Sequence, residues 1–191
     1  MNLKNKYWYF EKALTKNQCK EIINFGLSKT NIKAVVKDKK LNKIRNSNIC
    51  WLNEKWLYDL LIPWIDLANK NSGWEFDLNY FEAIQFTIYN KNQHYGWHQD
   101  SYIKDDTSDE RIRKLSMSVC LSDIKDFKGG EFEFDFIKTD NTKSSNKYIC
   151  KEIMGQGNII VFPSFMWHRV KQVTEGTRYS LVMWGNGPKF K

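Results

Sequence analysis

The sequence lacks the features of membrane, disulfide-rich and low-complexity proteins. Its 191 residues include only three prolines, and no stretch approaches the roughly 18 apolar residues that a membrane-spanning helix needs. The four cysteines form no CxxC pair, and each lies in an apolar or strand-like segment. We therefore expect buried, reduced thiols in a cytoplasmic protein. The first residues contain no uninterrupted apolar run, so a signal peptide is not expected.

Acidic residues are in deficit, with 22 Asp and Glu against 30 Lys and Arg, and the net charge is +8. Such an excess of positive charge can indicate an anionic partner such as nucleic acid. Here the lysines are scattered along the chain, which favours an ordinary solvated surface, and a nucleic-acid partner is not expected. The densest basic cluster comprises Lys37, Lys39, Lys40, Lys43 and Arg45.

Aromatic residues are abundant at 15% of the chain, and hydrophobic residues make up 41%. This is enough apolar material for one core, and its aromatic character favours β structure. From Trp74 onward the apolar pattern has a period of two, interrupted by glycine turns. The expected strands are 74–79, 81–90, 95–100, 114–122, 131–136, 147–153, 158–162, 168–173 and 177–184. Short strands at this spacing predict a sandwich or a barrel.

The first 73 residues instead show helical spacing. Thr15 and Gln18 form a capping-box pattern before one helix. Asn53 is expected to be the N-cap of a second helix that Pro63 kinks or restarts. Short strands are expected at 32–37 and 46–52. We expect a single domain, 1–191, in which residues 1–73 support a β core formed by residues 74–191.

The polar segment 101–113 interrupts the β pattern. It is expected to be a surface loop, and its position directly after the motif described next leaves a lid as an alternative.

Two of the three histidines occur in a pattern typical of a metal site. His98 and Asp100 are two residues apart, so in a strand their side chains project from the same face. His168 follows a later apolar strand that can lie alongside. Two histidines and one carboxylate are the ligand set of non-haem iron(II) oxygenases, which leaves metal positions open for other ligands. The remaining histidine, His94, is expected to be a surface or loop residue.

An arginine inside an apolar strand suggests what a further ligand would be. Arg178 and Ser180 share one face of the strand that contains them. A guanidinium binds a carboxylate through two parallel hydrogen bonds, and a hydroxyl can add a third. This pair suits the distal carboxylate of a 2-oxo diacid, whereas an unpaired arginine buried there would be unfavourable.

The chain resembles the prolyl 4-hydroxylase branch of the 2-oxoglutarate/Fe(II)-dependent dioxygenases, and is most similar to the PKHD-type hydroxylases. The resemblance covers residues 80–186, with a weaker part at Arg45-x-Ser47 and Trp51-Leu52. The motifs that carry it are Tyr89, Tyr95-x-Trp97-His98-x-Asp100, Arg113-Lys114-Leu115-Ser116, Gly129-Gly130-Glu131-Phe132, Gly157-x-x-x-x-Phe162-Pro163, His168-x-Val170 and Gly176-x-Arg178-Tyr179-Ser180-Leu181.

The resemblance implies a fold, a set of cofactors and a role for each matching residue. The fold is a double-stranded β-helix, or jelly-roll, with N-terminal helices packed on one sheet. The cofactors are Fe(II), 2-oxoglutarate and O2, with ascorbate as an optional addition. The roles fall on these residues: His98, Asp100 and His168 bind iron, Arg178 pairs with 2-oxoglutarate, Tyr89 and Ser180 support that pairing, and Tyr95 lies near the same pocket.

Other interpretations remain open, and one residue departs from the pattern. Cys120 stands where some members of the branch have a tyrosine or glutamine, which leaves one partner of the co-substrate undefined.

The branch implies hydroxylation of a prolyl residue in a protein or peptide. The alternatives are a small-molecule hydroxylase, a nucleic-acid dealkylase, and a catalytically silent β-sandwich that binds a partner. Dealkylases of this kind have a second arginine where this chain has Trp184. The oligomeric state is left undetermined.

Overall fold

A computed structural model describes residues 3–29, 44–101, 110–138 and 146–190. The strand expected at 32–37 lies outside these ranges, as does most of the basic cluster. Residues 102–109 also lie outside them, so the lid interpretation stays a prediction. Among the described residues, neither helix combines the length and apolar character that a membrane crossing requires.

Two helices occupy the N-terminal part, α1 (Lys16–Lys29) and α2 (Lys55–Asn71). The predicted capping box before α1 is confirmed, because Thr15 N donates to Gln18 Oε1 at 2.8 Å and Gln18 N donates to Thr15 Oγ1 at 3.2 Å. The N-cap of α2 is Glu54, so the assignment to Asn53 was wrong by one residue. The helix also runs through Pro63 without a restart. A continuous apolar face of α2 is buried against the sheet, and this packing offsets the local cost of the proline.

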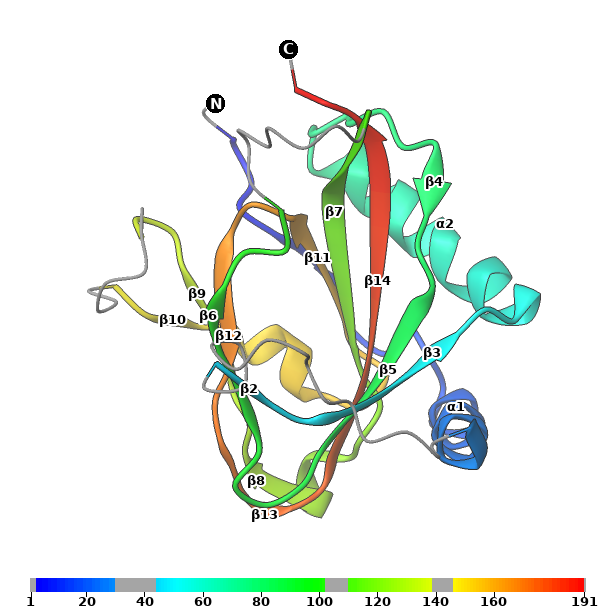
Figure 1. Cartoon of the computed structure of the whole chain (residues 1–191), viewed down its shortest axis with the longest axis vertical. Helices are drawn as coiled ribbons and strands as arrows, with labels where there is room; N and C mark the ends of the chain where they lie inside the picture. The colour runs from blue at the N-terminus through cyan, green and yellow to red at the C-terminus, as the bar shows by residue number, and fades with distance from the viewer. Residues whose placement is uncertain (1–2, 30–43, 102–109, 139–145, 191) are drawn as a thin grey trace.

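The strands form two facing antiparallel sheets (Figure 1). The major sheet has the order β1 (Trp8–Phe10), β11 (Ile159–Pro163), β7 (Arg111–Cys120), β14 (Arg178–Pro188), β5 (Ile84–Tyr89) and β3 (Asn48–Leu52), and β4 (Tyr80–Phe81) also pairs with β14. The minor sheet has the order β10 (Tyr148–Ile149), β9 (Phe132–Asp135), β12 (Trp167–Val170), β6 (His94–His98) and β2 (Arg45–Asn46). The last pair is β8 (Phe127–Gly129) with β13 (Val173–Gly176).

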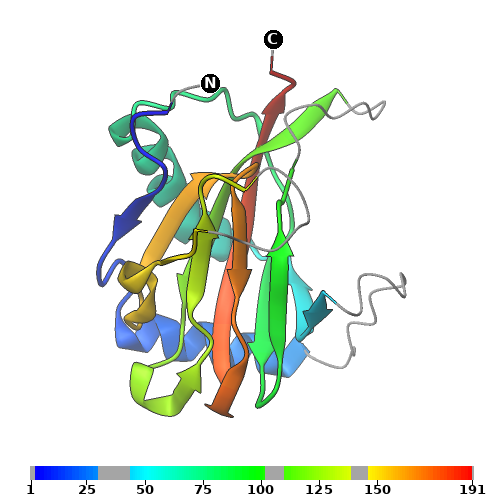
Figure 2. The same cartoon turned by 90° about the vertical axis from the view of Figure 1, so that its left-hand side faces the viewer.

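Residues 1–73 contribute β1, β2 and β3 as well as both helices, so they supply edge strands to both sheets. Figure 2 looks onto the minor sheet, and Figure 1 shows both helices on the outer side of the major sheet. One apolar cluster lies between the helices and the major sheet, and a second lies between the two sheets. In the first cluster α1 approaches the sheet closely at Gly26, where a Cβ atom would lie 2.6 Å from the ring of Phe86. This packing places the helices behind the major sheet and leaves the space between the sheets for a site.

The predicted strands after residue 80 are confirmed in outline, with several corrected bounds. Segment 81–90 divides into β4 and β5, 147–153 contains β10 and a 3-10 helix (Lys151–Met154), and 168–173 is shared between β12 and β13. A second 3-10 helix, Ile124–Asp126, precedes β8.

The strand predicted at 74–79 is wrong, because these residues are irregular. Glu75 has a φ of +51°, which a strand does not accommodate. The side chain of Asn69, on α2, donates to the carbonyl of Phe76 and accepts from its N–H. The segment is thus fixed to α2 by a side chain instead of to a neighbouring strand.

Candidate active site

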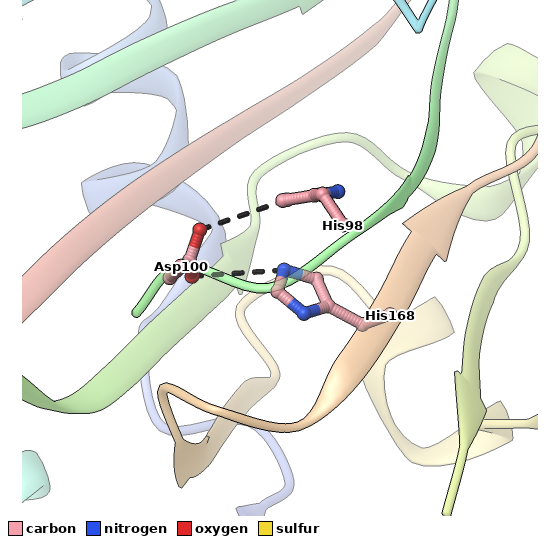
Figure 3. A group of neighbouring side chains, drawn as sticks. All are labelled: His98, Asp100 and His168. Atoms are coloured by element: carbon pink, nitrogen blue, oxygen red, sulfur yellow. Dashed lines mark ion pairs between the residues drawn. The ribbon is translucent and has the colours of Figure 1, made fainter. Parts of the chain in front are cut away.

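The predicted metal ligands come together between the sheets (Figure 3). His98 ends β6 and His168 lies on β12, and the two residues face each other in the strand register. Asp100 lies beyond β6, so the expectation that it belongs to the same strand was wrong. It is held instead by backbone hydrogen bonds, since the carbonyl of Ser164 accepts from the N–H of Asp100 at 2.9 Å and of Ser101 at 3.1 Å. One potential ligand atom from each of the three side chains lies within 4.8 Å of the others.

Both histidines have a defined orientation. The Nδ1 atom of His98 lies 2.8 Å from the carbonyl of Gly96, and that of His168 lies 2.8 Å from the carbonyl of Met166. A carbonyl only accepts, so each Nδ1 carries the proton and each Nε2 presents its lone pair. The two Nε2 atoms lie 3.6 Å from the two carboxylate oxygens of Asp100. These separations exceed a hydrogen bond and leave three donor atoms directed at a common centre.

The charges at this centre suit a metal cation. Burial alone would raise the pKa of Asp100, but the neighbouring His168 and His98 outweigh it and hold that pKa well below its usual range. Burial, together with His98, lowers the pKa of His168 to about 4. At neutral pH the site therefore presents a carboxylate and a neutral imidazole at these positions, which are the protonation states that bind metal.

A serine pair fixes the carboxylate of Asp100. Ser116 on β7 donates to Asp100 Oδ2 at 2.7 Å, and its hydroxyl lies 2.9 Å from that of Ser164. The hydrogen bond occupies one lone pair of Oδ2 and fixes the rotation of the carboxylate. Such outer hydrogen bonds orient metal ligands and restrict their geometry.

A cavity of about 250 Å³ adjoins the three residues and extends between the sheets. Arg178, on β14, is 1% exposed and lines this cavity. Its Nε and Nη2 atoms are buried without a hydrogen-bond partner among the described residues. A buried guanidinium with free donors is costly unless an anion pairs with it. The cavity thus contains a carboxylate-binding group beside a metal-binding group.

The remaining predicted residues line the same cavity. Tyr89 faces Arg178 across the β5–β14 pair, with its ring centre 5.7 Å from the guanidinium carbon. Ser180 is buried on β14 and also borders the cavity. The ring of Tyr95 stacks on that of His98, with centroids 3.5 Å apart. The structure therefore brings all seven predicted residues to one cavity.

Cys120 is buried in the apolar cluster between the sheets, and its Sγ lies 3.6 Å from the carbonyl of Ser122. It is opposite Ser180 in the strand register but is not among the residues that line the cavity. The thiol therefore packs in the core next to the site.

Sequence reasoning gave no role to several residues that line or support the site. Arg45 lies over the ring of Tyr95 at 4.6 Å, and Arg113 donates to both carboxylate oxygens of Glu82. Trp184 lies under Arg113 at 4.0 Å. Arg45, Arg113 and Ser116 all occur in the motifs quoted above, so the motif pattern contained the signal. Their contacts depend on the pairing of distant strands, which the motifs do not specify.

Comparison with known proteins identifies the family. Residues 84–186, more than half of the chain, match the model of the 2OG-Fe(II) oxygenase superfamily. The chain belongs to this superfamily. The family's name states its metal, Fe(II), its co-substrate, 2-oxoglutarate, and its use of oxygen. The prediction of the family is thereby confirmed, and with it the cofactors that the family's name states, Fe(II), 2-oxoglutarate and oxygen.

Curated relatives agree with this assignment. A PKHD-type hydroxylase of Prochlorococcus marinus (strain SARG) is 28% identical over 160 residues, 83% of this chain and 62% of the relative. One from Prochlorococcus marinus (strain MIT 9301) is 31% identical over 143 residues, 74% of this chain and 54% of the relative. The chain spans about three fifths or less of the length of such relatives.

Solved structures show the jelly-roll fold. A viral collagen prolyl hydroxylase from Paramecium Bursaria Chlorella virus-1 has a TM-score of 0.73 at 21% identity, with 96% of this chain and 97% of that chain covered. A Pseudomonas putida prolyl-4-hydroxylase has a TM-score of 0.70 at 17% identity, with 98% and 95% covered. The predicted fold, mainly β with N-terminal helices and a jelly-roll core, is confirmed.

The site fits the cofactors of this oxygenase family. Two imidazole nitrogens and one carboxylate that converge from one side are the donor set for iron(II) with open positions. The free donors of Arg178 fit a carboxylate in the same cavity.

Proposed function

We propose that this chain is an Fe(II)- and 2-oxoglutarate-dependent dioxygenase that hydroxylates a C–H bond of a peptidyl prolyl residue. The observation that carries the proposal is the shared cavity. It contains the converging ligand atoms of His98, Asp100 and His168 and the guanidinium of Arg178, whose Nε and Nη2 atoms have no hydrogen-bond partner in the described part of the chain. A metal ligand set alone would suit many enzymes, whereas this pair suits a metal together with an anionic chelator.

Each residue has one task in this proposal. His98, Asp100 and His168 hold iron(II), which supplies oxygen activation coupled to conversion of 2-oxoglutarate to succinate and CO2. Arg178 binds the distal carboxylate of 2-oxoglutarate, and Ser180 and the hydroxyl of Tyr89 add hydrogen bonds from the same wall. Tyr95 stacks on His98 and keeps its ring in the orientation that Gly96 sets. Together these contacts fix the co-substrate before the substrate reacts.

The prolyl substrate is supported by the relatives and by the shape of the site. Two solved structures of this fold are prolyl hydroxylases, and a third, from Trichoplax adhaerens, is a prolyl hydroxylase in complex with a peptide fragment of hypoxia inducible factor. At the cavity wall Trp51 is 50% exposed and lies 6.1 Å from Trp184 between ring centroids. Such aromatic walls suit the apolar ring of a proline in a peptide.

Two further parts of the proposal concern the surroundings of the enzyme. Ascorbate is an auxiliary reductant. The free, buried cysteines are consistent with a cytoplasmic location.

The first experiment measures succinate formed from 2-oxoglutarate in the presence of Fe(II). We expect His98→Ala, Asp100→Ala and His168→Ala each to reduce the rate by about 100-fold or more, because loss of one ligand weakens the metal site. His94→Ala is the matched control, since His94 lies on the same strand as His98 but outside the ligand group. Full turnover in any of the three ligand variants contradicts the metal assignment.

A second experiment addresses the substrate. Peptides with one proline are incubated with the enzyme, and mass spectrometry measures the addition of one oxygen atom. The control peptide has alanine in place of the proline. Equal oxygen addition to both peptides, or addition only to a free small molecule, would replace the prolyl substrate while leaving the oxygenase chemistry intact.

A further inference from the structure

The turn from Pro163 to Met166, called here the Ser164 turn, contacts two of the three proposed metal ligands. It is closed by a hydrogen bond from Met166 N to Pro163 O at 2.9 Å. Its Ser164 carbonyl accepts from the backbone of Asp100, and its Met166 carbonyl lies 2.8 Å from Nδ1 of His168. The positions of Asp100 and His168 therefore depend on where this turn lies.

Two further contacts bind the Ser164 turn to the ligand segment. Gln99 donates from Nε2 to the carbonyl of Phe165. The hydroxyl of Ser164 lies 2.9 Å from that of Ser116, which donates to Asp100. The turn and the segment 99–101 thus form one hydrogen-bonded unit with little freedom to move independently.

An aromatic cluster supports the outer side of the Ser164 turn. Phe165 packs edge-to-face on Phe190 with centroids 5.9 Å apart, and Phe190 packs edge-to-face on Phe76 at 5.4 Å. Lys114 Nζ lies 3.4 Å above the centre of the Phe190 ring. Lys114 also meets the turn through its backbone, because its carbonyl accepts from Ser164 N at 3.0 Å.

We propose that Phe190 and Lys114 are positioning residues that hold the Ser164 turn, and through it Asp100 and His168, in metal-binding geometry. Lys114 is 5% exposed, and an ammonium at that depth requires compensating partners. The Phe190 ring provides the closest aromatic contact, and the carboxylate of Asp77 adds an opposite charge nearby. Phe190 and Phe76 lie outside residues 84–186, the part that matches the family model. In Figure 1 the end of β14 lies beside the start of β7, where Pro188 pairs with Arg111. The contact between Lys114 and Phe190 lies next to this pairing. This inference rests on the proposed metal site.

The test measures Co(II) binding by its visible absorption, together with the Michaelis constant for 2-oxoglutarate. For Phe190→Ala we expect the dissociation constant for Co(II) to rise about tenfold, the lower end of the effect of losing an outer support of a metal ligand. At saturating Fe(II) the KM for 2-oxoglutarate should change much less than the Co(II) dissociation constant, because Arg178, which binds the distal carboxylate, lies on another part of the cavity wall. Phe190→Tyr keeps the ring and should restore wild-type metal binding. Lys114→Met keeps the apolar stem but removes the ammonium, and a partial loss is expected.

Phe25→Ala is the matched control for a purely structural effect. Phe25 on α1 is half-buried, packs edge-to-face on Trp56 at 5.8 Å and has Lys29 Nζ 5.2 Å from its ring centre. It therefore loses the same kinds of contact at a distance from the site, and we expect lower stability with unchanged Co(II) affinity. If Phe190→Ala does not fold, Phe190→Leu replaces it.

The outcomes distinguish the positioning role of Phe190 and Lys114 from the proposed function of the chain. Unchanged Co(II) affinity in Phe190→Ala or Phe190→Leu, or an equal loss in Phe25→Ala, overturns the positioning role and leaves the proposed function standing. If the wild-type chain does not bind Co(II), both proposals fail.

Discussion

At the scale of single residues, Arg178 shows that a residue suited to bind an anion can lower the stability of the fold while no anion is bound. Its side chain is almost completely buried, and two of its nitrogens have no hydrogen-bond partner among the described residues. A buried donor without a partner costs about 1–3 kcal/mol, and more for a charged group. The nearby ring of Tyr89 offsets only part of this. Before an anion binds, Arg178 therefore destabilises the folded chain.

Replacement of Arg178 by methionine tests whether this residue lowers the stability of the ligand-free protein while it binds 2-oxoglutarate. Met retains an apolar, flexible side chain, so we expect Arg178→Met to raise the free energy of unfolding of the ligand-free protein by about 1–3 kcal/mol. The KM for 2-oxoglutarate should rise by about 100-fold, because truncation of one partner of a buried charge pair costs roughly 2–5 kcal/mol. Urea denaturation and succinate formation measure the two effects.

The control for this prediction is Arg113→Met. Arg113 already pairs with Glu82 at 2.6 Å and lies over Trp184, so its loss should lower stability. If Arg178→Met also lowers stability without ligand, Arg178 is not the unpaired cation that the structure shows.

The residue scale also shows what the sequence could not specify about the site. His98 and His168 were predicted from their motifs and lie opposite each other in paired strands. Asp100 was expected to share the strand of His98 because the spacing of two fits a strand. Its actual position depends on Ser164, a residue far along the chain, which no local period reveals.

At the scale of helices and strands, local signals in the sequence predicted which elements form more accurately than the residues at which they begin and end. The capping box of α1 is local to the chain, and the structure confirms it. The strand predicted at 74–79 fails because alternation of apolar residues does not reveal the positive φ of Glu75 or the bonds from Asn69. Both features depend on how the segment packs against α2, which is a tertiary property.

The contact between α1 and the major sheet gives a prediction at this scale. We expect Gly26→Ala to lower the free energy of unfolding, because the new Cβ would lie 2.6 Å from the Phe86 ring. Overpacking typically costs about 1–3 kcal/mol, and this exceeds the ~1 kcal/mol that alanine gains over glycine in helix propensity. The measurement is the midpoint of chemical denaturation.

Two variants control that prediction. Asn24→Ala changes an exposed position of the same helix, so stability should stay the same or rise slightly. Phe86→Leu should reduce the additional cost of Gly26→Ala in a double-mutant cycle. Additive effects of the two substitutions would show that α1 does not approach the sheet at this point.

At the scale of the whole molecule, the fold depends on contacts between residues far apart in sequence. β1 at one end of the chain pairs with β11, and β2 pairs with β6, so both sheets are completed by N-terminal segments. Periodicity predicted most of the strands, the jelly-roll class came from the resemblance to a family, and the order of the strands came only from the structure. Non-local pairing of this kind leaves few local signals in a single sequence.

The four cysteines report on the integrity of the whole fold. All are free and buried, and Cys19 and Cys150 lie in the two different apolar clusters. Burial raises the pKa of Cys19 to about 11 and that of Cys150 to about 12, and it also raises the pKa values of Cys50 and Cys120. Because the thiolate is the reactive form, the folded chain should be almost unreactive at pH 8.

We expect a disulfide reagent such as DTNB at pH 8 to label none of the thiols within minutes in native buffer and all four in 6 M guanidinium chloride, about the strength that unfolds even hyperstable domains. The raised pKa values also set the sign of the pH dependence. The unfolded chain loses thiol protons near pH 9 while the folded chain keeps them, so stability should fall as the pH rises from about 9 toward 11 or 12. Denaturation midpoints measured across this range check the direction.

In the labelling experiment, one rapidly labelled equivalent in native buffer would show that at least one thiol is not enclosed by the fold. Substitution of Cys19, Cys50, Cys120 and Cys150 one at a time would then show which thiol gives this signal.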